Sequence, residues 1–460
     1  MVRRSLIKEF CGQPRPHPWH TFVHDELRRL LGGAEDPAFF RLIDERILAS
    51  IVPRLRQRYA LHLETATHGV STSEEMLSYL DGAGLLQELS LARAEAREAI
   101  AAINPVERLL LPRDEYTAYA ACRPPMAPVR FPAEFEPVGA VILGWPLYYP
   151  YCWRSHSRLV EEIVSEALAL VVVPNEEWQR AVELYLDVTS VPKTNLRFLY
   201  MPLDDVWTRD YGPTGVLAGP DAVPTMIANP YYMHYMSYQK LDAEVPYEVA
   251  RCLGTPIHKL PLVIEGGNLL SDGRGTLVMS DEVFDANPDV DRPKLDRILH
   301  DFFGCERLIL VPRLLGEATG HVDLIAKFLD EDTVLVGETE AGTRWHSEFE
   351  QACELLAGCE SSRGRPYEVI RVPCPPNRDQ EAGVWGYVNS LIVNSKVIVP
   401  VFGVAEDEQA LGIYRTALPQ KTVVGIDFRV FPLGSVHCQT KDLPAPFRER
   451  LEPEPRPSGR

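Results

Sequence analysis

The sequence lacks any apolar run of the roughly 18 residues that a membrane-spanning helix needs, so we expect no membrane span. It has no Cys-x-x-Cys pair and no cysteine spacing typical of zinc, so neither a metal nor a cofactor is predicted. Positive charge is also scarce. Asp and Glu number 65 against 47 Lys and Arg, giving a net charge of −18. This balance argues against nucleic acid as a partner and favours a cationic substrate.

The cysteines and the N-terminus both indicate a cytoplasmic protein. The chain has nine cysteines, an odd number, which favours free thiols in a reducing compartment over a disulfide framework. Near the N-terminus, Lys8 and Glu9 interrupt the apolar stretch that a secretory signal requires. Hydrophobic residues make up 45% of the chain and charged residues 24%, as in soluble globular proteins.

Composition divides the chain into three predicted parts. Residues 1–125 read as a mainly helical extension with a proline-rich linker, because apolar residues recur at helical spacing before residue 103. Frequent prolines continue the linker or extended character from Asn104 to Pro137, into the start of the next part. Residues 126–445 alternate strands and helices and form the predicted α/β domain. Residues 446–460 are rich in proline and charge, which predicts a disordered tail.

Three segments of the α/β domain share one pattern, in which polar residues precede a strand, a turn and a second strand. They span residues 264–279, 320–336 and 387–399, and the turn chemistry predicts a β-hairpin in each. Their regular recurrence indicates a radial array of similar units. The polar residues would then meet at one end of that array.

Several of these polar residues could carry chemistry. In Gly320–Phe328, strand alternation would place His321 and Asp323 on one face, suited to acid–base work and to holding a cation. Before Gly212-Pro213, Asp210 is predicted to lie on a constrained loop, where its carboxylate could grip a guanidinium with two hydrogen bonds. Each pattern alone also fits a structural ion pair.

Two further segments add a carboxylate and a thiol. Glu265 precedes two glycines, which allow close backbone approach, and could orient the His321 ring. Cys438 is expected on a strand near the end of the ordered chain, with His437 on the opposite face and therefore structural. A lone cysteine is ordinarily a small buried hydrophobe, and the other eight are interpreted in that way.

In combination, these motifs resemble the agmatine deiminase and bacterial peptidylarginine deiminase family of the guanidino-group-modifying superfamily. The resemblance covers roughly residues 130–445 and depends on five motifs in order: Trp207-x-Arg-Asp210-x-Gly-Pro, Glu265-Gly-Gly-Asn, Gly-His321-x-Asp323, Asn389 and Gly-x-x-His-Cys438-x-Thr. It implies a five-bladed α/β-propeller, or pentein, with a central polar cleft.

The resemblance also implies a role for each matched residue. Cys438 matches the nucleophile and His321 the general acid and base, while Asp210 and Asp323 match the carboxylates that bind the guanidinium. Three others match substrate-binding positions: Trp207, Asn389 and Glu265. Lys327 stands where the family usually has Arg, and Asn229–His234 replaces a stretch typical of agmatine deiminases.

The expected reaction is hydrolysis of a guanidino group, in peptidyl-arginine or an arginine-like substrate, through a covalent Cys438 thiouronium. The alternatives are agmatine deimination in putrescine synthesis, amidino transfer to an amine, a non-catalytic arginine-binding module, and a metal hydrolase that uses Asp210, His321 and Asp323. Residues 1–125 could extend substrate recognition or mediate self-association, so a homo-oligomer is one expectation.

Overall fold

The computed structural model describes residues 123–146, 152–203, 205–228, 241–317, 319–375, 386–429 and 435–450. The helices predicted before residue 103 lie outside these residues. Residues 446–450, predicted as part of a disordered tail, instead form most of the 3-10 helix η8 (Ala445–Arg450), in which Phe447 is fully buried. Within the described part, no helix combines the length and apolar character that crossing a bilayer requires.

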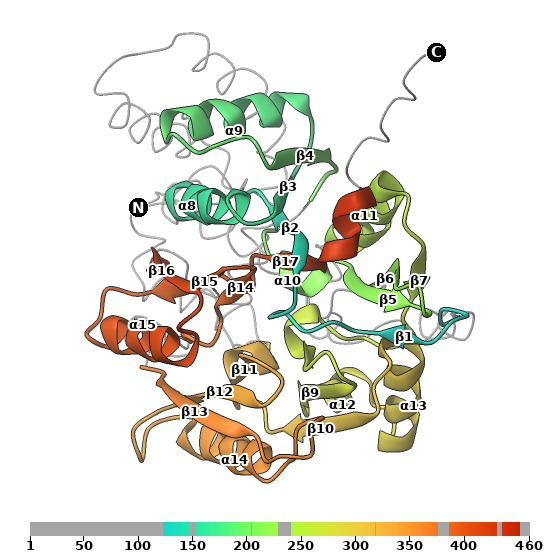
Figure 1. Cartoon of the computed structure of the whole chain (residues 1–460), viewed down its shortest axis with the longest axis vertical. Coiled ribbons are helices and arrows are strands. Elements are labelled where there is room, and N and C mark those ends of the chain that lie inside the picture. The colour runs from blue at the N-terminus through green and yellow to red at the C-terminus, as the bar shows by residue number, and fades with distance from the viewer. Residues whose placement is uncertain are drawn as a thin grey trace, which may run out of the picture.

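Five separate sheets carry the described strands, and in Figure 1 they follow one another around the middle of the molecule. Four of them repeat one order of elements: an antiparallel pair, one or two helices, and a strand parallel to the second of the pair. The three predicted hairpins are confirmed as antiparallel pairs. They are β8 (Leu270–Ser271) with β9 (Thr276–Ser280), β11 (Ala326–Phe328) with β12 (Thr333–Glu338), and β14 (Leu391–Val393) with β15 (Lys396–Val401).

A parallel strand completes each of these sheets after a helical crossover. The crossovers and strands are α12 (Glu282–Ala286) and α13 (Arg292–Phe303) before β10 (Arg307–Val311), α14 (His346–Ala357) before β13 (Glu368–Pro373), and α15 (Glu406–Ala417) before β16 (Thr422–Asp427). The sequence marks both ends of α13. Asp291 caps its N-terminus by accepting a hydrogen bond from the backbone of Lys294, and Gly304 ends it with a φ of 67°.

A fourth hairpin that we did not predict follows the same order. It consists of β5 (Thr214–Ala218) and β6 (Val223–Ala228), followed by η5 (Asp242–Glu244), α11 (Val245–Leu253) and β7 (Ile257–Lys259). The short strand β1 (Val129–Arg130) pairs with β5 at the edge. The segment around β1, predicted as a linker, is therefore part of the sheet structure.

The fifth sheet joins the two ends of the α/β domain. The C-terminal strand β17 (Lys441–Pro444) runs antiparallel to β2 (Val138–Gly144), and β2 runs parallel to β3 (Leu168–Val173) and β3 to β4 (Leu196–Tyr200). The crossover helices are α8 (Trp153–Val164) and α9 (Glu176–Val188). All residues of β2 and β3 are buried, as expected for central strands covered on both faces.

Candidate functional site

Asp210 lies in α10 (Thr208–Tyr211), a single helical turn, so our prediction of a loop was wrong. The turn ends at Gly212, whose backbone N–H donates to the carbonyl of Thr208 at 2.9 Å, and Pro213 cannot continue it. Trp207 caps the N-terminus of this turn and packs half-buried against the hydrophobic core. These constraints fix the direction of the buried Asp210 side chain.

His321 and Asp323 do not alternate along a strand, contrary to our prediction. His321 precedes and Asp323 lies within the 3-10 helix η7 (Val322–Leu324), and β11 begins only at Ala326. Glu265 likewise precedes a 3-10 helix, η6 (Gly266–Asn268). The helices α10, η6 and η7 contact in series and bring the four side chains together.

Gly267 marks the point where three of these side chains converge. A Cβ added to it would lie 2.5 Å from Nδ1 of His321, 2.7 Å from Oδ1 of Asp210 and 3.2 Å from Oδ2 of Asp323. The backbone N–H of Gly267 donates to Oδ1 of Asp210 at 2.9 Å. Glycine is thus required for close approach, since no positive φ is recorded at this position.

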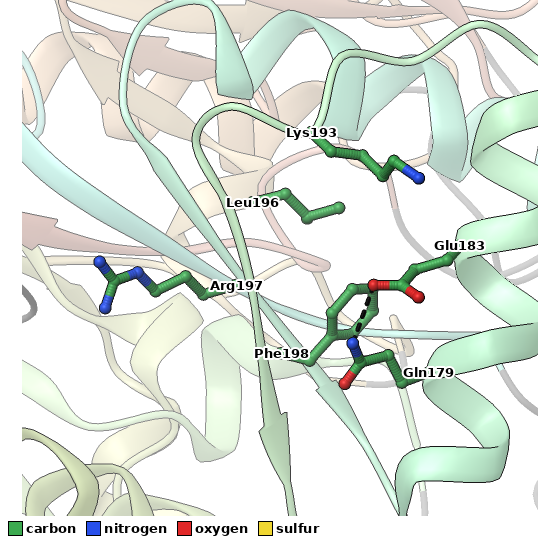
Figure 2. Close-up of a pocket in the computed structure, with 6 residues that line it drawn as sticks. All are labelled: Gln179, Glu183, Lys193, Leu196, Arg197 and Phe198. Atoms are coloured by element: carbon green, nitrogen blue, oxygen red, sulfur yellow. Dashed lines mark hydrogen bonds between the residues drawn. The ribbon is translucent and has the colours of Figure 1, made fainter.

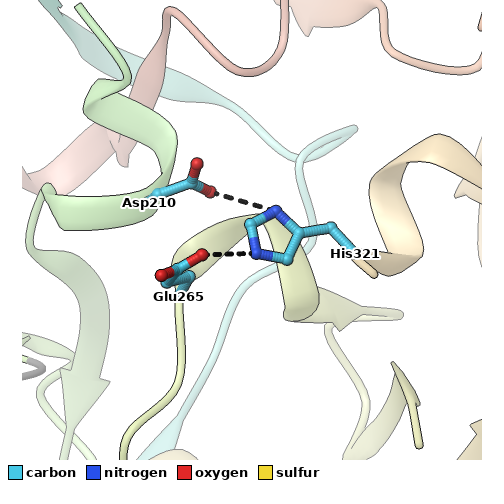
Figure 3. Close-up of side chains that lie close together, drawn as sticks. All are labelled: Asp210, Glu265 and His321. Carbon is cyan, nitrogen blue, oxygen red and sulfur yellow. Dashed lines mark hydrogen bonds and ion pairs between the residues drawn. The ribbon is translucent and has the colours of Figure 1, made fainter. Parts of the chain in front are cut away.

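The His321 ring lies between two carboxylates (Figure 3). Its Nε2 is 2.7 Å from Oε2 of Glu265, and its Nδ1 is 3.4 Å from Oδ1 of Asp210. All three side chains are buried. Because each ring nitrogen faces a carboxylate oxygen, the arrangement suits an imidazolium held between two anions.

Charge and burial shift the pKa values within this cluster. Burial alone would lower the pKa of His321, but the charges of Asp210 and Glu265 raise it well above its ordinary value. Burial raises the pKa of Asp210 to about 7; the charge of His321 opposes this shift, whereas Glu265 and Asp323 add to it. His321 therefore stays protonated in conditions where Asp210 can exchange its proton.

Among the described residues, Asp210, Glu265 and His321 form a group that could hold a metal ion, since their ligand-type atoms lie within 4.8 Å of one another. A metal would require one nitrogen of His321 to lose its proton and turn from its carboxylate. In the structure each nitrogen instead faces a carboxylate oxygen. The geometry therefore fits the ion pair better than a metal centre.

Cys438 lies in a turn rather than on the predicted strand, and β17 begins three residues later. Its Sγ is 4.0 Å from Oδ2 of Asp323 and 3.3 Å from Oδ1 of Asn389. Asn389 is fully buried, and its Oδ1 also accepts hydrogen bonds from the backbone N–H groups of His437 and Cys438 at 3.1 and 3.2 Å. Its position indicates that it holds the cysteine turn in place, and contact with a substrate stays a prediction.

The surroundings of Cys438 favour the neutral thiol. Burial raises its pKa well above the ordinary value, and the charges of Asp323 and Asp210 raise it further. The pKa of the Asp323 carboxyl is shifted in the opposite direction, to a lower value. Burial would raise its pKa, but the hydrogen bond and charge of His437, with His321 and Arg209, lower it overall. A cation entering between these carboxylates would offset their effect on the thiol.

Sequence reasoning missed the connections of His437 and the whole role of Glu134. We expected His437 to point away from the site, but its Nδ1 is 2.7 Å from Oδ2 of Asp323 and its Nε2 is 2.7 Å from Oε2 of Glu134. Glu134 belongs to the segment that we interpreted as a linker. A usable signal was its place between the apolar residues Ala133 and Phe135, of which Ala133 is buried and Phe135 is partly buried against the core.

A surface pocket lies apart from this cluster, between α9 and β4 (Figure 2). Its volume is about 490 Å³, and it is lined by Gln179, Glu183, Lys193, Leu196, Arg197 and Phe198. None of the residues predicted for the functional site lines it. The four residues predicted as catalytic instead lie where α10, η7 and the cysteine turn meet, beside η6.

Comparison with solved structures shows the same fold in related proteins. The structure of the "Putative Arginine Deiminase" from Porphyromonas gingivalis matches with a TM-score of 0.61 and 25% identity, covering 69% of this chain and 98% of that one. The agmatine deiminase of Enterococcus faecalis matches with a TM-score of 0.60 and 22% identity, covering 69% and 96%.

Sequence comparison identifies the family. A Streptomyces coelicolor protein named "Putative agmatine deiminase" is 33% identical over 344 residues, which make up 68% of this chain and 98% of that protein. The model of the Porphyromonas-type peptidyl-arginine deiminase family matches residues 130–444, more than half of the sequence. Given this match and the shared fold, the chain belongs to the Porphyromonas-type peptidyl-arginine deiminase family.

Proposed function

We propose that this protein hydrolyses the guanidino group of peptidyl-arginine or an arginine-like substrate to a ureido product and ammonia, with Cys438 as the covalent nucleophile. Family membership and the clustering of Cys438, His321, Asp210 and Asp323 support this proposal. The family model matches residues 130–444, and about two-thirds of this chain covers nearly the whole length of its relatives, which supports assigning the reaction to the α/β domain.

One observation carries the proposal. Oδ1 of Asp323 is buried and, among the described residues, has no hydrogen-bond partner, while Oδ2 of the same carboxylate accepts from His437 and lies 4.0 Å from the sulfur of Cys438. A buried carboxylate oxygen without a partner is costly. A guanidinium N–H bound at Oδ1 would satisfy it and would bring the guanidinium carbon close to the thiol.

The two carboxylates hold the substrate, and its charge activates the nucleophile. Asp210 and Asp323 form charge-assisted hydrogen bonds to the guanidinium, so the planar cation is fixed beside Cys438. The bound positive charge lowers the pKa that these carboxylates raise in the empty site. Cys438 then releases its proton to solvent, and the thiolate attacks the guanidinium carbon and forms a tetrahedral adduct.

His321 moves the protons in both halves of the reaction. It donates a proton to the departing nitrogen, the carbon–nitrogen bond breaks, and ammonia is released. An S-alkylthiouronium remains on Cys438. His321 next accepts a proton from a water that attacks the same carbon, and cleavage of the carbon–sulfur bond releases the ureido product. Glu265, at 2.7 Å from Nε2, orients the ring and stabilises its charged form.

Agmatine is the second candidate substrate, because relatives that match over the same region bear agmatine deiminase names. Residues 229–234, which differ from the stretch typical of agmatine deiminases, lie outside the described residues. The choice therefore depends on an assay of ureido product with agmatine, arginine and arginine-containing peptides. Turnover of peptides above agmatine supports the first candidate, and the reverse order supports the second.

Three controls separate hydrolysis from the remaining alternatives. Cys438→Ala should remove turnover and retain guanidine binding, whereas full activity in this variant would exclude the covalent route. Unchanged activity after treatment with a chelator excludes a metal hydrolase, and an unchanged product on addition of an amine acceptor excludes amidino transfer. A protein that binds arginine side chains but forms no ureido product would be a binding module.

We also propose the five-bladed arrangement of the sheets and a cytoplasmic location. Four sheets built on one order of elements, and a fifth sheet that β17 closes, support a five-bladed α/β-propeller. Seven cysteines of the described residues are free thiols, which supports a reducing cytoplasm.

A further inference from the structure

Four ionisable side chains that are buried or nearly so form a chain of contacts that starts at the proposed substrate carboxylate, Asp323. Oδ2 of Asp323 faces Nδ1 of His437 at 2.7 Å, and Nε2 of the same ring faces Oε2 of Glu134 at 2.7 Å. Oε1 of Glu134 in turn accepts from Nζ of Lys327 at 2.6 Å. The side chains of His437 and Lys327 are 4% and 2% exposed and that of Glu134 10%, so water contributes little to these contacts.

Both partners of the His437 ring are carboxylate oxygens, which sets the role of its two nitrogens. Ionised carboxylates only accept hydrogen bonds, so both ring nitrogens must donate. Both carboxylates are in an environment that favours ionisation. Burial would raise the pKa of Glu134, but Lys327 and His437 lower it well below its ordinary value, and the pKa of Asp323 is also lowered. The chain therefore alternates in charge from Asp323 to Lys327.

The backbone anchors of Glu134 make this chain a rigid connection. Besides Lys327, its Oε1 accepts from the backbone N–H of Ile392 at 2.7 Å, and Nη2 of Arg209 lies 3.6 Å from its Oε2. Arg209 is itself held by Asp442 at 2.8 Å. Glu134 thus fixes the far side of the His437 ring to neighbouring sheets, while the near side holds one oxygen of Asp323.

We propose that His437 and Glu134 are positioning residues, which hold Oδ2 of Asp323 so that its unpartnered Oδ1 is presented to the substrate cation. The proposal depends on the proposed function, because it assigns Asp323 to guanidinium binding. Lys327 balances the charge of Glu134 and keeps it from competing for the substrate. Neither His437 nor Glu134 exchanges atoms with the substrate.

The test compares two alkylating reagents of nearly equal size at Cys438. 2-Chloroacetamidine is cationic and 2-chloroacetamide is neutral, and in both cases the Cys438 thiolate displaces chloride to form a thioether. The ratio of their rates at Cys438, followed by mass spectrometry of its peptide, reports how well the carboxylates hold a cation. A general loss of folding would also remove this preference, so only variants that keep the unfolding transition of the unaltered protein are compared.

Four variants divide the chain of contacts into its parts. His437→Asn places its amide N–H near the position of Nδ1 and so keeps the donor to Asp323, whereas His437→Gln reaches the position of Nε2 and keeps only the donor to Glu134. Glu134→Gln removes the charge behind the ring but retains its shape. Glu136→Gln is the matched control, since Glu136 pairs with Arg130 at 2.6 Å and contacts none of these groups.

We expect the amidine preference to fall in a fixed order. Glu136→Gln keeps the preference of the unaltered protein, Glu134→Gln and His437→Asn lower it partly, and His437→Gln lowers it roughly tenfold or more, as expected for loss of a charge-assisted hydrogen bond. An equal preference in His437→Asn and His437→Gln, or an unchanged preference in His437→Gln and Glu134→Gln, would overturn the proposal. No amidine preference in the unaltered protein would instead count against the proposed function.

Discussion

At the scale of single residues, Asp323 and His321 should have separable effects. Asp323→Asn removes a charge-assisted hydrogen bond to the substrate cation, worth about 1.5–3 kcal/mol, so we expect KM to rise roughly 10- to 150-fold and kcat to fall as well. His321→Ala should lower kcat far more than it changes KM, because its protons move during the reaction. Steady-state kinetics on the better of the candidate substrates measure both.

The control for this pair is Asp442→Asn, which changes a carboxylate that pairs with Arg209 rather than facing Cys438. It should alter KM much less than Asp323→Asn does. Substrate binding of normal strength in Asp323→Asn would show that this carboxylate does not hold the guanidinium.

The raised pKa of Asp210 predicts proton release on substrate binding. With its pKa at about 7 in the empty site, Asp210 is mostly protonated at about pH 6 and mostly ionised at about pH 8. The guanidinium binds the ionised form, so binding should release a proton and weaken as the pH falls below about 7. His321, whose pKa is raised well above its ordinary value, keeps its proton across this range.

Isothermal titration calorimetry of the inactive Cys438→Ser protein in buffers of different ionisation enthalpy measures this release. We expect close to one proton at about pH 6 and little at about pH 8. Equal proton release at both values would contradict the assignment of Asp210. Repeating the titration with Asp210→Asn, which has no proton to release, provides the control.

At the scale of elements, the contact between α10 and η6 depends on Gly266. A Cβ at this position would lie 2.0 Å from the carbonyl oxygen of Arg209 and 2.8 Å from Nζ of Lys441. Gly266→Ala should therefore push the two elements apart, lower the free energy of unfolding by about 1–3 kcal/mol, and reduce kcat/KM. Chemical denaturation and kinetics give the two values.

Gly412 offers the matched glycine. It lies inside α15, and a Cβ added there would contact nothing within 4 Å. Gly412→Ala should raise the free energy of unfolding by about 0.5–1 kcal/mol and leave activity unchanged. If Gly266→Ala behaved in the same way, close packing between α10 and η6 would not be what positions Asp210 beside His321.

At the scale of the whole molecule, residues 1–122 are open to a direct test. About two-thirds of this chain matches its relatives over 94–98% of their length, and the family model matches residues 130–444. A chain beginning at Arg123 keeps β1 and the hydrogen bond between the Arg123 carbonyl and His258. We expect it to fold and to deiminate a small guanidine.

The substrate dependence of this shortened chain distinguishes two roles for the extension. Activity lost on peptides but kept on a small guanidine indicates that the extension binds parts of the substrate remote from the reacting carbon. A change of oligomeric state with equal activity on both substrates, measured by sedimentation, indicates self-association. Equal loss on both substrates in a folded monomer would contradict the recognition hypothesis.

The sequence by itself determined the repeated hairpins and the set of residues to consider. Turn residues around Gly273, the acidic turn at 330–332 and Asn394 mark the three hairpins, because local backbone preference decides where a strand reverses. The order of the five motifs pointed to the family before any contact was known. Such signals are local in the chain and therefore readable from it.

Only the tertiary structure decided how these residues face one another. Asp210, His321 and Cys438 were each assigned to the wrong local conformation, because short turns of one helical cycle are stabilised by contacts from other elements rather than by their own propensity. Glu134 and His437 meet although 303 positions separate them. No local pattern encodes that pairing, since it arises only when β17 at one end of the domain joins β2 at the other and closes the fifth sheet.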